Sequence, residues 1–446
     1  MAEDSSASRN GNIGEHSEFL AFATIIGDGY LDLTDPTGEV SKGRLSIGEV
    51  SREAPGQKSK GTKKAPGVLI RKAFFLRDGD VWIRKEVDGS ERKLCPRAEV
   101  LSLVSDLRRD LVAWTESNKS KNSDEDPEDD EGSSRPLEST NKLLRLLDVE
   151  ELKSPSDSKS DLYLTFLQPT GASVMQGFSV KSLMGANSCL INHSAATLVT
   201  YEIFNSTPVE VLEVEAGYVR EVAEASRVTK RKQLEDPQSA KLPKKGPATI
   251  IPAIDRKGIQ LKFSSVPDEV FRQNLMSIDT CFPQMLAHVI YHRFLHAETS
   301  PVEIVSAESS VKMMEALGYS ASCASRDLGD KLKTLFKRYA QGMNSQELWD
   351  GATEVKGGWV LVIKDGRVTG YCFEDDDKFR DYLFKSTYFD TPSTKRTTKE
   401  KKLMGAYVGR PYSVGGRTFI DLSLTVKFRK GTVEGHEKTK RRRRLP

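Results

Sequence analysis

The stretch Asp161–Ser182, DLYLTFLQPTGASVMQGFSVKS, predicts two short strands joined by a Pro-Thr-Gly turn. Leu162–Leu167 alternates apolar and polar residues, and Gly177–Lys181 places polar side chains at every second position. Because strand side chains alternate between the two faces of a sheet, Asp161 and Lys181 bring a carboxylate and an ammonium to one sheet margin. Such a pair is half of a metal-dependent phosphodiester-cleaving site. Taken alone, however, the pattern is more typical of an ordinary half-exposed hairpin.

The continuation Gly177–Ile203, GFSVKSLMGANSCLINHSAATLVTYEI, resembles the HpaII-type family of type II restriction endonucleases, which carry a phrase of the form G-F-S-I-K-S-x-L-G. Further phrases agree in the same order: GEHSE at 14–18, GGWV at 357–360, DTPSTKR at 390–396 and the terminal strand 421–428. The resemblance thus spans about residues 12–428. The chain departs from the family at Thr425 and Lys427, where Gln and Arg are expected, and at Thr397, where His is expected. These departures bear on sequence specificity.

The resemblance implies an α+β (mixed α/β) fold: a central mixed sheet flanked by helices, as in restriction endonucleases, with a helical and β-containing C-terminal lobe. It also implies the PD-(D/E)xK pattern, in which an Asp, a second acid and a Lys surround one sheet edge. Asp161 would be the metal-ligand aspartate. The position two residues before Lys181, where the second acid is expected, holds Ser179.

Two replacements for that acid are open. Glu18, with Glu15 one helical turn away, could reach in from an N-terminal helix, and the family phrase favours Glu18 as a second metal ligand. Otherwise Ser179 or the Val180 carbonyl completes the site with water. The expected cofactor is Mg²⁺, which prefers hard oxygen ligands. Lys181 would orient and help deprotonate the attacking water and stabilise the developing charge.

Several polar and basic side chains are candidates for contacts with duplex DNA. One predicted loop carries the amides of Asn187 and Asn192 and the hydroxyl of Ser188, which suit contacts with base edges or phosphates. A polar turn explains these residues equally well. Arg396 is the best single candidate for bidentate guanine recognition, with a solvated basic loop as the alternative. The predicted DNA-binding residues are Asn187, Ser188, Asn192, Ser393, Lys395, Arg396 and Lys427.

Composition is compatible with this interpretation. The 446 residues are 37% hydrophobic and 29% charged, with a net charge of +3 that hides an acidic run at 124–131 and basic runs at 395–402 and 438–444. The sequence contains no run of eighteen apolar residues that could form a transmembrane helix, so we expect no membrane partner. Five scattered cysteines without a CxxC pair favour a reducing compartment. We therefore expect a cytoplasmic protein, or a nuclear one if the host is eukaryotic.

The pattern along the chain predicts an amphipathic helix from Gly14 to Gly27 and one final strand, Thr418–Phe428, paired with Gly405–Val408. The expected divisions are a disordered N-terminus (1–12), a helix and β-hairpin lobe (13–117), an acidic disordered linker (118–136), the catalytic core hairpin region (137–225), a basic loop (226–250), a helical and C-terminal β region for DNA contact (251–430) and a basic disordered tail (431–446).

The sequence therefore predicts a Mg²⁺-dependent, sequence-specific endonuclease acting on double-stranded DNA, paired functionally with a DNA methyltransferase. The resemblance implies a CCGG-like target. A DNA-binding protein that keeps the fold with weak or no catalysis is the alternative, because Ser179 replaces an acid. His288, His292 and His296 share one helical face, but a hydrogen-bonded helix face is more typical of them than a zinc protease. The oligomeric state stays open, with a homodimer as one option.

Overall fold

The chain forms two compact units, each assembled from separate segments. The first contains residues 1–188, 352–379 and 429–446, and the second contains 189–351 and 380–428. The consecutive ranges expected from the sequence stay a prediction, and most of 118–136, 226–250 and 431–446 lies outside the described residues. The computed structural model describes residues 10–36, 41–54, 70–85, 88–121, 134–152, 160–167, 172–184, 188–192, 194–214, 216–217, 250–296, 298–345, 347–351, 355–373, 376–390 and 411–429.

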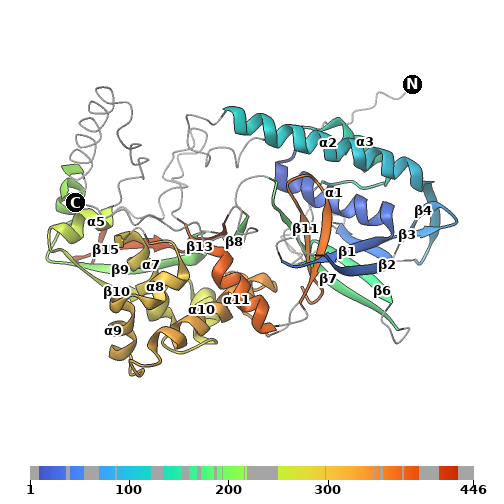
Figure 1. Cartoon of the computed structure of the whole chain (residues 1–446). Helices are drawn as coiled ribbons and strands as arrows, with labels where there is room; N and C mark the ends of the chain where they lie inside the picture. Colours follow the sequence, from blue (N-terminus) through green and yellow to red (C-terminus); the bar gives the residue numbers. More distant parts are fainter. Residues whose placement is uncertain are drawn as a thin grey trace, which may run out of the picture. The chain divides into compact units, whose positions relative to one another are not determined.

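The first unit is built on a mixed nine-stranded sheet of order β1-β12-β11-β7-β6-β2-β3-β4-β5 among the described residues (Figure 1). Its strands are β1 (Tyr30–Thr34), β2 (Ser41–Ala54), β3 (Ile70–Arg77), β4 (Asp80–Lys85), β5 (Glu91–Pro96), β6 (Leu162–Leu167), β7 (Ser173–Ser182), β11 (Gly358–Val362) and β12 (Val368–Cys372). The predicted hairpin is confirmed: β6 has the predicted bounds, and β7 is longer at both ends because it pairs with β6 on one side and β11 on the other.

Six strands of this sheet form a closed circuit because β2 is long enough to pair with both β1 and β6. Its first half, up to Ser46, pairs with β1, and its second half pairs with β6 and β3. The register with β6 shifts between Ile47 and Glu49, so Gly48 lies at a bulge, which bends a strand. The parallel bridge between Leu33 of β1 and Gly370 of β12 closes the circuit.

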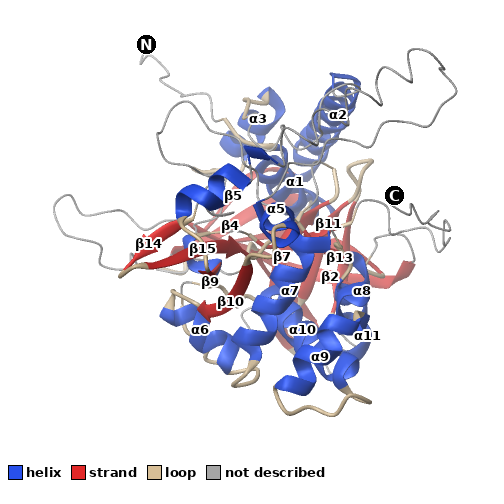
Figure 2. Ribbon diagram, turned by 90° about the vertical axis from the view of Figure 1, so that its left-hand side faces the viewer, coloured by secondary structure: helices blue, strands red, loops and turns tan. Residues whose placement is uncertain are grey.

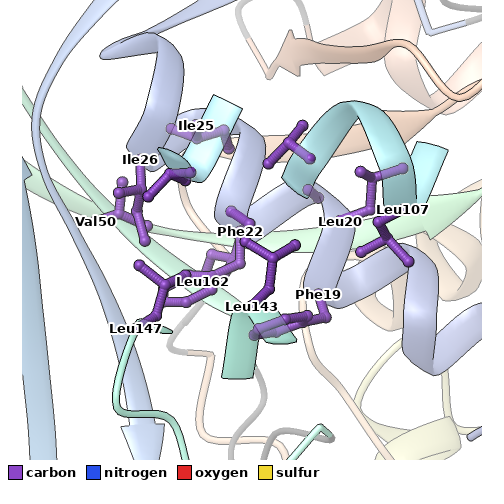
Figure 3. Packing of buried hydrophobic residues seen from close by; sticks show 14 of the residues in the cluster. Phe19, Leu20, Phe22, Ile25, Ile26, Val50, Leu107, Leu143, Leu147 and Leu162 are labelled. Carbon is purple, nitrogen blue, oxygen red and sulfur yellow. The ribbon is translucent and has the colours of Figure 1, made fainter. Parts of the chain in front are cut away.

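Helix α1 (Ile13–Asp28) is capped at both ends, by the Asn12–Glu15 capping box and by Gly29 in the left-handed conformation. The predicted helix is confirmed, but its amphipathic character is wrong: α1 is buried on nearly every side, Glu18 being an exception. It lies between the sheet and the helices α2 (Arg97–Lys121) and α3 (Glu138–Leu146), so both of its faces must be apolar (Figure 1). Figure 3 shows Phe22 and Ile26 of α1 gathered with Val50 and Leu162 of the sheet.

Gly357 and Gly358 are required by close backbone packing. A Cβ at Gly357 would overlap the ring of Phe178, and a Cβ at Gly358 would overlap the carbonyl oxygen of Tyr371 on β12. Gly358 also has φ +143°, which L side chains rarely adopt. The glycine pair therefore lets β11 enter between β7 and β12.

We expect Gly358→Ala to lower the free energy of unfolding by about 3 kcal/mol, because backbone strain and overpacking add. Urea titration of the purified protein measures this loss. Gly79→Ala is the matched control, since Gly79 also has positive φ (+81°) but nothing lies within 4 Å of an added Cβ. Gly79→Ala should cost about 1 kcal/mol from strain alone. Equal losses in the two variants would contradict the role of close packing.

The second unit combines two antiparallel sheets with a group of helices, seen together in Figure 2. Its strands are β8 (Cys189–Ile191), β9 (Leu198–Phe204), β10 (Gln260–Ser265), β13 (Thr387–Phe389), β14 (Tyr412–Val414), β15 (Arg417–Ser423) and β16 (Val426–Phe428). Its helices are the 3-10 turn η2 (Ala195–Thr197), α5 (Ile250–Arg256), α6 (Glu269–Met276), α7 (Phe282–His296), α8 (Pro301–Ser306), α9 (Glu308–Ala316) and α10 (Ala324–Ala340). The division between the units passes through α11 (Asp376–Ser386).

The predicted single strand Thr418–Phe428 is wrong. It is two strands in different sheets: β15 pairs with β9 and β14, whereas β16 pairs with β13 and β8. The change occurs at Leu424 and Thr425, where the Leu424 N–H donates to Thr197 and the Thr425 carbonyl accepts from Asp390. Because these partners satisfy the buried backbone groups, the chain can leave one sheet and enter the next. The predicted partner strand at 405–408 lies outside the described residues.

Candidate active site

Asp161 lies at the start of β6, and three hydrogen bonds join it to β7. Its backbone N–H donates to the Phe178 carbonyl at 3.0 Å. Its carboxylate oxygen Oδ2 accepts the Val180 N–H at 2.6 Å and the Ser179 hydroxyl at 3.0 Å. Hydrogen bonds from an amide and a hydroxyl fix the orientation of a carboxylate. The carboxylate is therefore preorganised at the margin of the sheet.

The strand register brings Asp161 and Lys181 to the same face. Leu162 pairs with Phe178, so the preceding residue, Asp161, lies opposite Ser179. Lys181 is two residues after Ser179 and shares its face. The alternate residues Phe178 and Val180 point to the other face, where they belong to the core that contains α1.

Lys181 is partly buried and lies beside Leu361 of β11. In the described part of the chain, no carboxylate lies within ion-pair distance of its ammonium group. The ammonium therefore remains available for an anionic ligand at this face. Its neighbours on the same face, Trp359 and Leu361, are buried and keep the base of the side chain in an apolar setting.

The two acids of α1 have different surroundings. The Glu15 carboxylate accepts the Asn12 N–H at 3.0 Å, and the Asn12 side chain accepts the Glu15 N–H at 2.9 Å. This capping box gives Glu15 a structural role at the helix start. Glu18 is half-buried on a helix that packs against the Phe178 face of the sheet. The charges of Glu18 and Asp161 both act on Arg52.

Arg52 of β2 is a functional candidate that the sequence analysis missed. Only 6% of it is exposed, and its guanidinium donates to the carbonyls of Glu151 and Leu152. Burial lowers the pKa of Arg52, and the charges of Glu18, Asp161 and Glu151 raise it. A buried cation thus lies in the electrostatic field of both candidate metal-binding acids. No local sequence signal could reveal it, because these partners are 34 to 109 residues away from Arg52 along the chain.

The structure describes three of the predicted DNA-binding residues: Ser188, Asn192 and Lys427. The Ser188 hydroxyl donates to the Ser182 carbonyl at 2.6 Å, and Asn192 is exposed. Lys427 forms an ion pair with Asp390 at 3.0 Å, and both side chains are largely buried. Its charge is therefore already balanced, and a DNA contact through Lys427 would have to displace Asp390. The predicted residues Asn187, Ser393, Lys395 and Arg396 lie outside the described residues.

The three histidines of α7 form a ladder, with ring centroids 6.1 and 4.4 Å apart. His288 and His292 are hydrogen-bonded to the hydroxyls of Ser310 and Ser309. Burial lowers the pKa of both rings to about 4, so they are neutral near pH 7. Across the described residues, no group of three or more His, Cys, Asp or Glu side chains could hold a metal ion. The ladder is a hydrogen-bonded helix face.

Comparison with known proteins adds independent information. A family model described as HpaII restriction endonuclease matches residues 128–428. The Type II restriction enzyme HpaII of Haemophilus parainfluenzae is 28% identical over 293 residues, which are 66% of this chain and 71% of that enzyme. No solved structure matches. The family match includes the hairpin with Asp161 and Lys181 but not α1, which carries Glu18. Within the described residues, no helix is long and apolar enough to cross a membrane.

Proposed function

This chain belongs to the HpaII family of type II restriction endonucleases, and from that premise we propose that it hydrolyses phosphodiester bonds of double-stranded DNA with Mg²⁺, using Asp161 and Lys181. The arrangement at the β6–β7 margin carries the proposal. A carboxylate held by Val180 and Ser179 shares one face with an ammonium that has no ion pair among the described residues. We further propose that the nine-stranded sheet is a version of the restriction-endonuclease core.

The residues present fit Mg²⁺. Asp161 offers carboxylate oxygen, and Glu18 can supply a second carboxylate from α1, which matches the preference of this ion for hard oxygen ligands. When bound, Mg²⁺ would neutralise charge on the attacked phosphate and lower the pKa of water at the site. Ser179 donates a hydrogen bond to Asp161 and so orients that carboxylate.

Lys181 provides the second part of the proposed chemistry. Its ammonium orients the attacking water and stabilises the negative charge that develops on the phosphate. The surrounding sheet holds its backbone, because Lys181 pairs with Leu361 within a parallel ladder that runs from Gly358 to Val362.

We propose a CCGG-like target and a cognate methyltransferase as the functional partner, both on the strength of the family resemblance. The departures at Thr397, Thr425 and Lys427 fall in the segments expected to contact DNA. Of these, the structure describes Thr425 and Lys427, and both are largely buried in the second unit. Because these two side chains are buried, we infer that their departures from the family change the shape of the DNA-contact segment more than they change direct contacts with DNA bases.

Plasmid cleavage tests the function. Purified full-length protein should convert unmethylated plasmid into discrete fragments with Mg²⁺ and leave it uncut with EDTA. Plasmid methylated at CCGG sites is the second arm: protection there supports the target, whereas equal cutting of both plasmids refutes it. Retarded but uncut DNA across a range of Mg²⁺ concentrations would support a catalytically silent DNA-binding protein, the alternative that Ser179 raises.

A further inference from the structure

Two serines link the helix that carries Glu18 to the strand that carries Lys181. The Ser182 hydroxyl at the end of β7 donates to the Ser17 hydroxyl of α1, with the oxygens 2.9 Å apart. The Ser17 hydroxyl in turn donates to the Ile13 carbonyl at 2.7 Å. Ser17 is fully buried and Ser182 is half-buried. The two hydroxyls therefore form a directed chain, which we call the Ser17–Ser182 bridge.

The bridge is placed beside both parts of the proposed active site. Ser17 directly precedes Glu18 in the chain, and Ser182 directly follows Lys181. Apolar packing by residues such as Phe19 and Phe22 stabilises α1 on the sheet, but hydrophobic burial has no preferred direction. A hydrogen bond depends on distance and angle, so the bridge can fix how far α1 slides or rotates against β7.

The same strand end also holds the start of the next segment. The Met184 N–H donates to the Ser182 hydroxyl at 3.3 Å, and the Ser188 hydroxyl donates to the Ser182 carbonyl at 2.6 Å. Ser182 is thus bonded to α1 and to residues on both sides of 185–187, which include one of the predicted DNA contacts. Its hydroxyl is part of a network whose members depend on one another.

We propose that Ser17 and Ser182 are positioning residues, whose hydrogen bond sets the place of the Glu18 carboxylate relative to Asp161 and Lys181 on the sheet. The inference rests on the proposed function. Loss of the bridge would let α1 shift, and a misplacement of about 1 Å in a catalytic group can cost on the order of 10²-fold in rate. Metal binding would weaken for the same reason, because the two carboxylates would no longer be held at one spacing.

The test is a double-mutant cycle of Ser17→Ala, Ser182→Ala and the double variant in the full-length protein. Single-turnover cleavage rates should fall roughly 10- to 100-fold in each single variant. The cleavage rate of the double variant should be no lower than that of the slower single variant, since both changes remove the same hydrogen bond. Calorimetric titration with Mn²⁺ in the absence of DNA gives a readout besides activity, and its Kd should rise about tenfold in all three variants.

Two controls separate positioning from general damage. Ser105→Ala removes a helical hydroxyl that also donates to the carbonyl four residues before it, but Ser105 is exposed, and its variant should behave as wild type. Ser182→Thr keeps the hydroxyl and should recover the wild-type rate and Mn²⁺ affinity. The melting temperatures of Ser17→Ala, Ser182→Ala and the double variant should stay within about 4 °C of wild type, which separates positioning from unfolding.

Each outcome decides one question. Wild-type rate and Mn²⁺ affinity in Ser17→Ala and Ser182→Ala, or losses that simply multiply in the double variant, would overturn the inference while leaving the proposed function intact. A wild-type protein that binds DNA and does not cut it overturns the proposed function instead. Even in that case, if the wild type binds Mn²⁺ more tightly than Ser182→Ala does, the bridge is supported as a positioning contact.

Discussion

Lys181→Ala will lower the single-turnover rate of DNA cleavage by about 10³-fold, the largest effect that we expect from one substitution. The physical reason is the loss of a preorganised charge where the transition state becomes more negative. The ammonium has no ion-pair partner among the described residues, so its removal leaves no opposite charge unpaired and should change the melting temperature little. Cleavage should fall while gel retardation of target DNA in Ca²⁺ changes only a few-fold.

Lys85→Ala provides the matched control for this prediction. Lys85 is an exposed lysine at the end of β4 in the same sheet, and its removal changes the net charge equally. Cleavage by Lys85→Ala should stay within about twofold of wild type, since single exposed charges contribute little. If Lys181→Ala cuts DNA as fast as Lys85→Ala, Lys181 has no role in the chemistry.

Asp161→Asn should reduce cleavage to a similar extent, by about 10³-fold, through the loss of a metal ligand. The substitution is nearly isosteric. Its amide oxygen can still accept the Val180 N–H and the Ser179 hydroxyl, so the β6–β7 junction should persist. The variant should also bind Mn²⁺ more weakly in calorimetry, which distinguishes a lost ligand from a distorted strand.

The comparison of Asp161 with two other acids sharpens this prediction. Asp32→Asn is the control, because Asp32 on β1 forms a half-exposed ion pair with Arg44 on β2. It should retain nearly full activity. Glu18→Gln tests whether α1 supplies the second carboxylate: a loss of Mn²⁺ affinity comparable to that of Asp161→Asn is expected. Full cleavage by Glu18→Gln would favour the alternative in which Ser179 or the Val180 carbonyl completes the site with water.

The PD-(D/E)xK pattern places an acid two residues before the lysine, and this chain has Ser179 at that position. In this chain the side chain at that position donates a hydrogen bond to Asp161, whereas a carboxylate there would repel it. The local environment of Asp161 therefore suits a serine. A second acid then has to approach from outside the strand, and we propose Glu18 on α1, whose charge acts on Arg52 together with that of Asp161.

The amino-acid sequence by itself determined the features that depend on neighbouring residues. Alternation in Leu162–Leu167 predicted β6 with its observed bounds, and the two-residue period of β7 put Ser179 and Lys181 on one face. Such signals are local, because side-chain direction and turn chemistry are set within a few residues.

The tertiary structure alone decided the features that join distant segments. Burial of α1 on nearly every side follows from packing between the sheet and α2, so its own periodicity misled the prediction. The break between β15 and β16 depends on Thr197 and Asp390, and the charge of Lys427 is balanced by that same aspartate. Arg52 and the Ser17–Ser182 bridge likewise pair residues far apart in the chain. Their partners are chosen by packing and by the need to satisfy buried polar groups, which no short stretch of sequence encodes.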